Sequence, residues 1–403
     1  MEHWKKIKLG NVILDLIGGG TPSTKEESYW IGNIPWMTSA HITSKEIFTG
    51  QRKISESGLN ESATKLIPAN NLLIASRVGI GKAAINRIDV AISQDLTGVV
   101  LDRSRILPEY VYWWLTLNQN KLKSLAQGST IKGILKEDLA KLELELPSLN
   151  IQKEICDILN LVDDATQKAD EAIEHTERLK RGLMLKLLTQ GIGHIEFKET
   201  KIGRIPKEWE VVKLRDTLKN GELIELTTLE QDKNYIDISS INNKSFTIEN
   251  TLLINKSNAP SRARKLVKTG DVIFATTRPN LKNIAVVPMH LDGQICSTGF
   301  CVLRPNEFLV TTDWLFYNSI NNKFVEKVSS KMKGATYPAV NDTDIKNELI
   351  PLPNLKEQAK INMILNEVTK KLLFERRRKE SWTRIKQGLM NDLLTGKKRV
   401  MLS

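Results

Sequence analysis

The chain is poor in the residues on which many catalytic and metal sites depend. Its 403 residues include three cysteines, Cys156, Cys296 and Cys301, which lack the spacing of a zinc site or a disulfide framework. We expect reduced, mostly buried thiols and no bound metal. The five histidines are dispersed, and none shows metal-pair spacing or an obvious triad context. We therefore assign no catalytic residue to this chain and predict that it is not itself an enzyme.

Long apolar segments are also missing. No stretch approaches the roughly eighteen apolar residues of a membrane span, and the segment 1–6 lacks the apolar core of a signal peptide. An apolar fraction of 40% is nevertheless enough to build hydrophobic cores. The sequence predicts a globular, cytoplasmic protein of about two to four domains with no membrane partner.

Acidic residues are the scarcer charge. The chain has 59 Lys and Arg against 47 Asp and Glu, a net charge of +12, which favours a polyanionic partner. Part of the excess is concentrated in the segments 261–265, 376–379 and 397–399. A solvated basic face is the alternative interpretation of each segment.

The chain contains an internal repeat. At least sixteen identities fall on one offset of 206 positions without a gap, from Gly128 and Gly334 to Thr189 and Thr395. The fronts of the two halves match more weakly, at offsets of 205 and 200, and between these anchors the halves diverge. A shared scaffold with two different variable surfaces is expected if each half recognises something different. Two similar units can also present a pseudo-twofold surface to a twofold partner.

Each half changes from a strand-rich pattern to one long helical pattern. Short β-branched and apolar runs bounded by Gly, Pro and Asn indicate strands and turns. After Pro147 and Pro353 come about forty residues with no proline, a single glycine and apolar residues at three-four spacing, which predicts a helix of roughly 60 Å in each half. The expected boundaries are a first domain at 1–147, a helix at 148–192, a linker at 193–208, a second domain at 209–353, a helix at 354–396 and a tail at 397–403.

These patterns predict an α+β fold in which two tandem α/β domains are separated by two long antiparallel helices, a pseudo-twofold internal repeat. We expect the helices to pack against each other, with other subunits covering part of their apolar stripe. The alternative is that each amphipathic helix lies on its own domain. The residues assigned to subunit interfaces are Ile155, Val162, Leu179, Leu183, Leu187, Ile361, Val368, Leu389 and Leu393.

Several motifs resemble the specificity subunits of type I restriction-modification enzymes. The linker 197–209 resembles the family's entry into its second domain, and the segments 146–152 and 352–358 resemble its domain-to-helix junctions. Gly-Gly-Gly-Thr-Pro-Ser at 18–23 looks like part of a common variety of target-recognition domain. The second domain departs from this pattern, with Asn-Gly-Glu-Leu at 220–223 near the equivalent place. Its target therefore cannot be inferred from the first.

The resemblance implies a non-catalytic subunit that reads a bipartite sequence in double-stranded DNA, with one half-site for each variable domain. The helices would set the gap and hold two methyltransferase subunits, and restriction subunits would join the complete complex. S-adenosylmethionine, ATP and Mg²⁺ would then belong to partner subunits, with no cofactor in this chain. In keeping with that implication, the sequence has no Asn-Pro-Pro-aromatic motif for amino methylation, and Gly79-Ile80-Gly81-Lys82 lacks the residues of a complete phosphate loop.

Candidate DNA contacts fall in loops that follow the strands of each half. Arg77 and Arg278 occupy the same place in the repeat to within one residue, and each guanidinium could contact a base, a phosphate or a structural carboxylate. Gly128 and Gly334 lie within a second cluster, for which a turn capped by Thr is the alternative. The full set of predicted DNA-binding residues is Thr21, Ser23, Arg77, Lys82, Ser129, Thr130, Lys132, Arg262, Arg264, Arg278, Asn280, Lys282, Lys333, Thr336 and Tyr337.

Two rival functions remain open at this stage. A structural adaptor would keep the duplicated assembly surface without reading DNA. Binding of a duplex library by the chain with its methyltransferase partner would distinguish the DNA-reading subunit from this adaptor. A self-sufficient DNA-modifying enzyme is the third interpretation. Methyl transfer by the chain alone would favour it.

Overall fold

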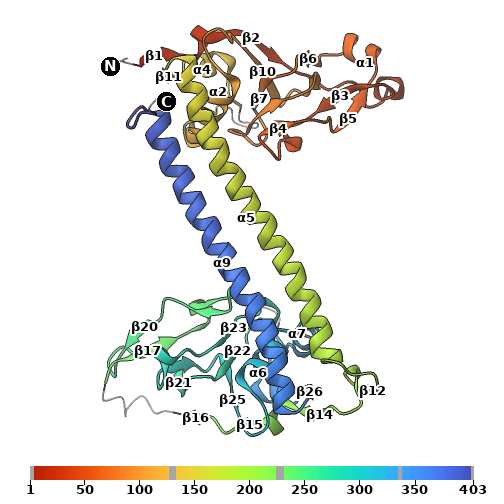
Figure 1. Ribbon diagram of the computed structural model, residues 1–403, viewed down its shortest axis with the longest axis vertical. Coiled ribbons are helices and arrows are strands. Elements are labelled where there is room, and N and C mark those ends of the chain that lie inside the picture. The colour runs from red at the N-terminus through yellow and green to blue at the C-terminus, as the bar shows by residue number, and fades with distance from the viewer. Residues whose placement is uncertain (1–3, 127–132, 224–230, 335–337, 401–403) are drawn as a thin grey trace. The chain divides into compact units, whose positions relative to one another are not determined.

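The computed structural model describes residues 4–126, 133–223, 231–334 and 338–400. The chain divides into two compact units, which we call unit 1 (residues 1–170 and 377–403) and unit 2 (residues 171–376). Each unit contains one α/β domain and segments of both long helices (Figure 1). The fold is α+β with a tandem repeat, as the sequence predicted.

Unit 1 has a five-stranded sheet in the order β2-β10-β7-β8-β4 and a four-stranded sheet in the order β5-β3-β9-β6. A separate pair, β1 and β11, joins the start of the chain to the strand that precedes the first long helix. The strands are β1 (Lys5–Lys8), β2 (Ile13–Gly18), β3 (Ile34–Met37), β4 (Glu46–Ile47), β5 (Arg52–Ile54), β6 (Lys65–Ile67), β7 (Asn71–Ala75), β8 (Ala83–Asn86), β9 (Val90–Ile92), β10 (Leu96–Leu101) and β11 (Glu143–Leu146). The short helices are α1 (Glu56–Asn60), α2 (Pro108–Leu117), α3 (Gln119–Ser124) and α4 (Lys136–Ala140).

Unit 2 repeats this plan. Its four-stranded sheet has the order β15-β25-β22-β23, its five-stranded sheet the order β16-β21-β24-β17-β20, and β14 pairs with β26 as β1 does with β11. The strands are β12 (Phe197–Thr200), β13 (Gly203–Pro206), β14 (Glu210–Lys213), β15 (Leu218–Lys219), β16 (Glu222–Leu223), β17 (Lys233–Ile236), β18 (Ile241–Asn242), β19 (Thr247–Ile248), β20 (Leu252–Ile254), β21 (Ala263–Leu266), β22 (Val272–Ala275), β23 (Ile284–Val286), β24 (Ile295–Ser297), β25 (Phe300–Pro305) and β26 (Leu349–Leu352). The short helices are α6 (Thr312–Ile320), α7 (Asn322–Ser329) and α8 (Asp342–Lys346).

The same strand relations recur in both units. A parallel pair, β3 with β9 in unit 1 and β17 with β24 in unit 2, lies in the second sheet of each domain. An inner strand of the first sheet, β7 or β22, is short and mostly apolar, and every residue in it is buried. The repeat detected in the sequence is therefore a repeat of topology.

The two long helices expected from the sequence are α5 (Leu149–Gln190) and α9 (Leu355–Leu394). Each starts just after a proline and ends before a glycine in the left-handed region, Gly191 at φ +65° and Gly396 at φ +69°. The helices run antiparallel where they meet within each unit. In unit 1 Asp163 pairs with Lys386 at 2.5 Å, and in unit 2 Glu177 pairs with Arg376 at 2.7 Å.

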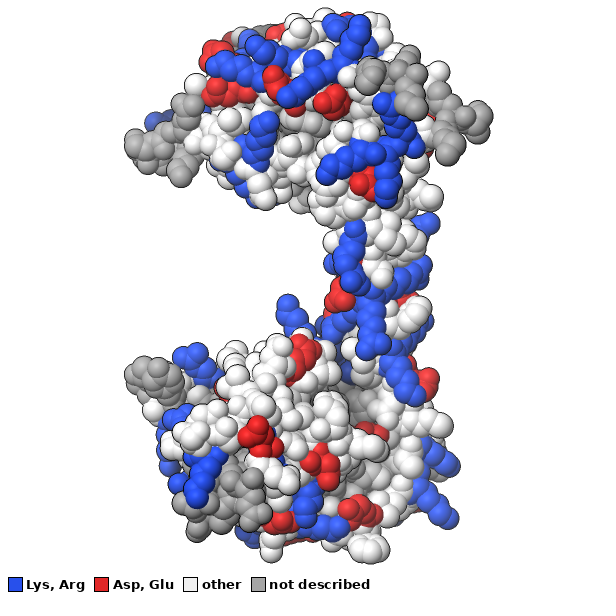
Figure 2. All heavy atoms as spheres, turned by 90° about the vertical axis from the view of Figure 1, so that its left-hand side faces the viewer, with Lys and Arg blue, Asp and Glu red and all other residues white. Residues whose placement is uncertain are grey.

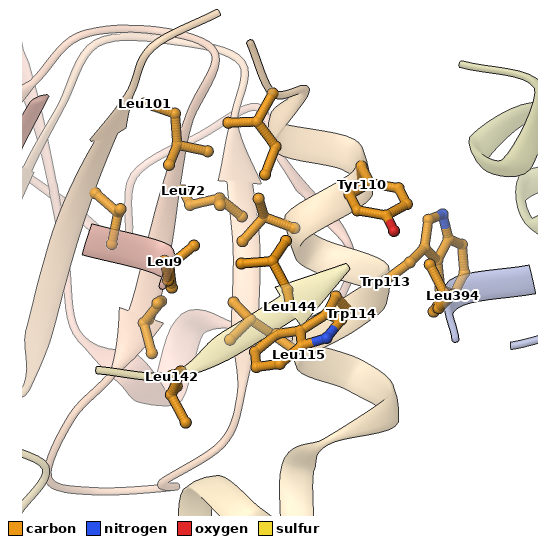
Figure 3. Close-up of a cluster of buried hydrophobic side chains, with 14 of the residues drawn as sticks. Leu9, Leu72, Leu101, Tyr110, Trp113, Trp114, Leu115, Leu142, Leu144 and Leu394 are labelled. Carbon is orange, nitrogen blue, oxygen red and sulfur yellow. The ribbon is translucent and has the colours of Figure 1, made fainter. Parts of the chain in front are cut away.

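Each domain core is completed by the end of the long helix that starts in the other half of the sequence. The core of unit 1 contains Leu393 and Leu394 from α9, and Figure 3 shows Leu394 beside Trp113 of α2. The core of unit 2 contains Leu187 and Leu188 from α5, which are the same positions of the repeat. Packing of the helices against each other and packing of each helix on a domain were predicted as alternatives, and each helix makes both kinds of contact.

A buried glutamine fastens the start of each long helix to its domain. Gln152 accepts a hydrogen bond from the Leu107 amide at 2.8 Å and donates to the carbonyls of Arg105 and Pro147. Gln358 makes the same three kinds of contact in unit 2, with the Thr311 amide and the carbonyls of Leu309 and Pro353. Both side chains are fully buried. The identity of this residue in the two halves is therefore explained by the backbone groups that it satisfies.

The residues assigned to subunit interfaces need a correction. Ile155, Leu187, Ile361 and Leu393 belong to the cores just described, and at 0–6% exposure they offer no surface to another subunit. Their apolar spacing reflects packing inside the chain, a distinction that periodicity cannot make. Val162 is also buried, and Leu183, Val368 and Leu389 are half-buried. Leu179 is 44% exposed, so it alone of the set keeps a substantial free surface.

Candidate nucleic-acid interface

One pair of loops occupies the same place in both units. The first follows β7 and carries Arg77, and the second follows β22 and carries Arg278. The carbonyl of Ser76, just before Arg77, accepts a hydrogen bond from the amide of Ile134 at 2.8 Å. In unit 2 the carbonyl of Thr276 accepts one from the amide of Val340 at 3.0 Å. Each arginine loop is therefore attached to the segment that follows the second predicted cluster of its domain.

The side chains of Arg77 and Arg278 are exposed, and their guanidinium groups differ from those of the structural arginines. Neither has a hydrogen bond or ion pair within the part of the chain that the structure describes. Structural arginines here look different: Arg87 pairs with Glu46 at 2.6 Å, and Arg304 pairs with Asp271 at 2.9 Å in a largely buried network. The structural ion pair considered for Arg77 and Arg278 thus lacks a carboxylate, which leaves both side chains available to a ligand.

The two loops achieve similar turns with different residues. Unit 1 places Gly79 and Gly81 in the left-handed region, at φ +71° and +90°, where glycine is unstrained. Unit 2 places Arg278 and Lys282 there, at φ +49° and +55°, which costs on the order of 1 kcal/mol per residue. A strained residue with an exposed charged side chain is typical of a functional position. The exposed side chain of Asn280 lies between the two strained residues.

The two lysines of these loops point back toward the protein. Lys82 donates to the carbonyl of Ile42 at 3.4 Å, and Lys282 donates to the carbonyl of Ile320 at 3.1 Å and to the side chain of Asn322. Burial lowers the pKa of Lys282 below its ordinary value. The lysines therefore also hold their loops in place, which the arginines do not.

The glycine run at 18–23 is explained by packing. A Cβ on Gly19 would lie 2.2 Å from the carbonyl oxygen of Ile92, and one on Gly20 would lie 2.5 Å from the backbone of Ala63. The exposed hydroxyl of Thr21 donates to Gln94 at 2.5 Å, and the Ser23 side chain is exposed. The turn thus has a structural cause, and its two hydroxyls lie at the surface.

Gln94 is a candidate that the sequence-based prediction missed. Its side chain is exposed in the turn between β9 and β10, and the next residue, Asp95, accepts a hydrogen bond at its carbonyl from the Ser76 amide beside Arg77. An amide side chain can make a bidentate contact with adenine. Its position in a turn between two buried strands is the sequence feature from which it could have been predicted.

The basic segment 261–265 lies beside the Arg278 loop. The Arg262 carbonyl accepts a hydrogen bond from Thr298, and the neighbouring Gly299 carbonyl accepts one from Thr276. Arg262 and Arg264 are both exposed, and Arg264 also donates to the carbonyl of Ser261 at 3.1 Å. This segment therefore adds two exposed arginines beside the loop, one of which is held by its own backbone.

The second predicted cluster is only partly described. Lys333 is exposed, and its backbone pairs with Ala339, which also bridges to Thr277 next to Arg278. The remaining predicted residues of this cluster lie outside the described residues: Ser129, Thr130, Lys132, Thr336 and Tyr337.

Basic side chains predominate on the exposed helices, and the three cysteines are buried. Figure 2 shows that Lys and Arg outnumber Asp and Glu along the long helices on the face it presents. Cys156, Cys296 and Cys301 are buried, and burial raises the pKa of each thiol to about 12. Within the described ranges no group of His, Cys, Asp and Glu is arranged to hold a metal ion. The described helices also include none long and apolar enough to cross a membrane.

The sequence matches a known family in both halves. The profile of the family "Type I restriction modification DNA specificity domain" matches residues 1–175 and 206–383. The chain is 25% identical over 421 aligned positions to the MjaVIII specificity subunit of a type I restriction enzyme from Methanocaldococcus jannaschii, covering 99% of this chain and 94% of that protein. It is 21% identical over 389 positions to the EcoDI specificity subunit from Escherichia coli, covering 89% and 79%.

Solved structures share the fold. The S subunit of a type I restriction-modification system from M. genitalium aligns with a TM-score of 0.61 at 16% identity, covering 99% of this chain and 97% of that one. A chain from a structure describing complex assembly and conformational transition of the type I restriction-modification system aligns with a TM-score of 0.55 at 16% identity, covering 99% of both chains. At this identity the likeness shows the fold.

Proposed function

The chain belongs to the family of type I restriction-modification DNA specificity domains, and we propose that it reads a bipartite sequence in double-stranded DNA, one half-site for each unit. Sequence specificity for DNA follows from the family. The division into two half-sites is supported by one observation above all. Two domains with the same frame present an exposed arginine at the same place, Arg77 and Arg278, on loops that otherwise differ.

In this proposal the two loops read different base pairs. An arginine held by a rigid strand end can donate two hydrogen bonds to guanine in the major groove. Gln94 in unit 1 and Asn280 in unit 2 add amides suited to adenine. Because these neighbours differ between the units, the half-sites are expected to differ as well.

We further propose that the chain is non-catalytic and that its partners perform the chemistry. Two methyltransferase subunits would bind the duplicated surfaces that include the long helices, and restriction subunits would complete the complex. S-adenosylmethionine, ATP and Mg²⁺ would be bound by those partners. The repeat supports two equivalent partners, since similar surfaces occur once in each unit.

The test is to sequence methylated adenines in random duplex DNA after incubation with the chain, its methyltransferase subunits and S-adenosylmethionine. The expected product is methylation at one motif with two specified halves and an unspecified gap. The chain alone should give neither methylation nor cleavage, even with ATP and Mg²⁺. Assembly without any sequence preference would instead identify the chain as a structural adaptor, and product from the chain alone would identify an enzyme.

A further inference from the structure

A basic groove of about 620 Å³ lies within unit 2, between the two long helices and the domain. Its walls come from α5, α9, the turn between β18 and β19, the Arg278 loop and helix α7. Two carboxylates, Glu177 and Glu326, face six basic side chains, so cations exceed anions by four. The basic residues that define the groove are Lys180, Arg181, Lys244, Lys282, Lys323 and Arg376.

The carboxylates do not neutralise the whole groove. Glu177 is engaged by Arg376 at 2.7 Å, and Arg376 also donates to the carbonyl of Lys244 at 3.0 Å. Lys180 has no ion pair or hydrogen bond within the described residues, and its ammonium lies 5.9 Å from the ring centroid of Tyr317. Burial and the charge of Arg376 lower the pKa of Lys180 to about 8. Among the described residues no carboxylate pairs directly with this half-buried ammonium, and the nearby Glu177 is engaged by Arg376.

In unit 1 the lysine equivalent to Lys180 is paired with a carboxylate. Lys386 is the repeat equivalent of Lys180 and lies 5.1 Å from the ring centroid of Trp113, but Asp163 pairs with it at 2.5 Å. The residue 206 positions after Asp163 is Thr369, which carries no charge. The supporting aromatic contact survives in both units, since Asn160 accepts from Trp113 and Asn366 accepts from Tyr317. Within the described part of unit 2, the direct ion pair that Lys386 makes in unit 1 has no equivalent at Lys180.

We propose that this groove binds phosphates of the DNA backbone beside the half-site that unit 2 reads. The proposal rests on the proposed function, and it is favoured by continuity with the candidate recognition loop. That loop begins with Arg278 at its exposed side and ends with Lys282 in the groove wall. Lys and Arg side chains bind phosphates without reading sequence and fix the position of the protein on the duplex. A backbone phosphate would supply the counter-ion that Lys180 lacks.

The test uses the complex assembled with its methyltransferase subunits and the double variant Lys180→Gln/Lys323→Gln. Lys323 is exposed on α7 and lines the groove. The affinity for DNA should fall by the same factor whether or not the DNA contains the motif that the complex methylates. The slope of the logarithm of the association constant against the logarithm of the salt concentration should become shallower by about 0.9 for each phosphate that the variant no longer binds. The motif itself should not change. Lys186→Gln is the matched control, an exposed lysine of α5 outside the groove.

Each other outcome overturns the proposal. A folded double variant with wild-type affinity and salt slope would show that the groove holds no phosphate. Loss of assembly with unchanged DNA binding would assign the groove to an acidic segment of a partner protein, and an altered motif would assign it to base reading. If the double variant does not fold, Lys323→Gln alone must still show the shallower slope. Failure of the proposed function is distinguishable, because the wild-type complex would then lack a bipartite motif.

Discussion

Units 1 and 2 share the contacts that hold the long helices and differ in the contacts available to a ligand. Gln152 and Gln358 satisfy equivalent backbone groups, and the same aromatic-asparagine contact recurs in both. The arginine loops use glycines in unit 1 and strained side chains in unit 2, and a lysine is neutralised in one unit and left without a counter-ion in the other. The comparison indicates that the frame is fixed by buried polar groups, while exposed loops are free to specialise.

Replacing the buried glutamine of each unit tests whether the two units hold their long helices in the same way, and it should cost the most stability. Gln152→Leu and Gln358→Leu should each destabilise the chain by about 2–4 kcal/mol, because each leaves one amide and two carbonyls without a partner in the interior. Denaturant unfolding of the full chain would measure both, with Gln167→Leu as an exposed control on α5. A loss of less than about 0.5 kcal/mol in the free energy of unfolding for either variant would show that the two glutamines do not play the same structural role.

The next effect concerns recognition. Arg77→Ala and Arg278→Gly should each cost about 1–3 kcal/mol and relax only the half-site of their own unit. Glycine is chosen at 278 because the residue has φ +49°, where alanine would add backbone strain. Methylation rates of the assembled complex on a duplex library would give the loss position by position. A uniform loss across all sequences would instead make the arginine a phosphate contact.

A smaller effect separates the two equivalent lysines. Lys386→Met should destabilise the chain by about 1–2 kcal/mol at pH 7, because Asp163 loses its partner. Lys180→Met should leave stability unchanged or raise it by about 1–2 kcal/mol, since it removes a desolvated charge and a weak contact with Tyr317. Thermal or denaturant unfolding would compare them. Equal losses would show that Lys180 is a structural cation after all.

The same lysine predicts a pH dependence with a defined sign. Its pKa is about 8 in the folded chain and about 10.5 when unfolded, so between these values the unfolded state binds more protons. The stability of the wild type should therefore rise, relative to Lys180→Met, as the pH increases from 8 to 10.5. The other charged groups that line the groove are Glu177, Arg181, Lys244, Lys282, Lys323, Glu326 and Arg376, and the ring of Tyr317 lies beside the Lys180 ammonium. The wild type and the variant share all of these groups. A difference that is constant over this range would contradict the lowered pKa.

The sequence predicted the frame better than it predicted the surfaces. The offset of 206 located both long helices, and the weaker offset of 200 matched Arg77 with Arg278 to within one residue, each after a buried strand. Periodicity and repeat spacing are properties of the local sequence, so they could be read without the fold. The sequence did not show that Ile155 and Ile361 face the interior of the same chain. An apolar stripe looks the same in the sequence whether it packs in the core of its own chain or against another subunit. The missing counter-ion of Lys180 depends on residues brought together only by folding, and so does the exposure of Gln94.

We propose that two separate DNA-reading domains share one frame and that the long helices set the distance between their half-sites. The decisive experiment inserts four residues after Asp170 in α5 and four after Arg376 in α9, where the chain passes from one unit to the other. Each insertion adds about 6 Å and turns the helix only about 40° beyond one full turn. Since DNA rises about 3.4 Å per base pair, methylation mapping of the assembled mutant should show a gap longer by about one or two base pairs and both half-sites unchanged. An active mutant with the original gap, or with altered half-sites, would contradict the account.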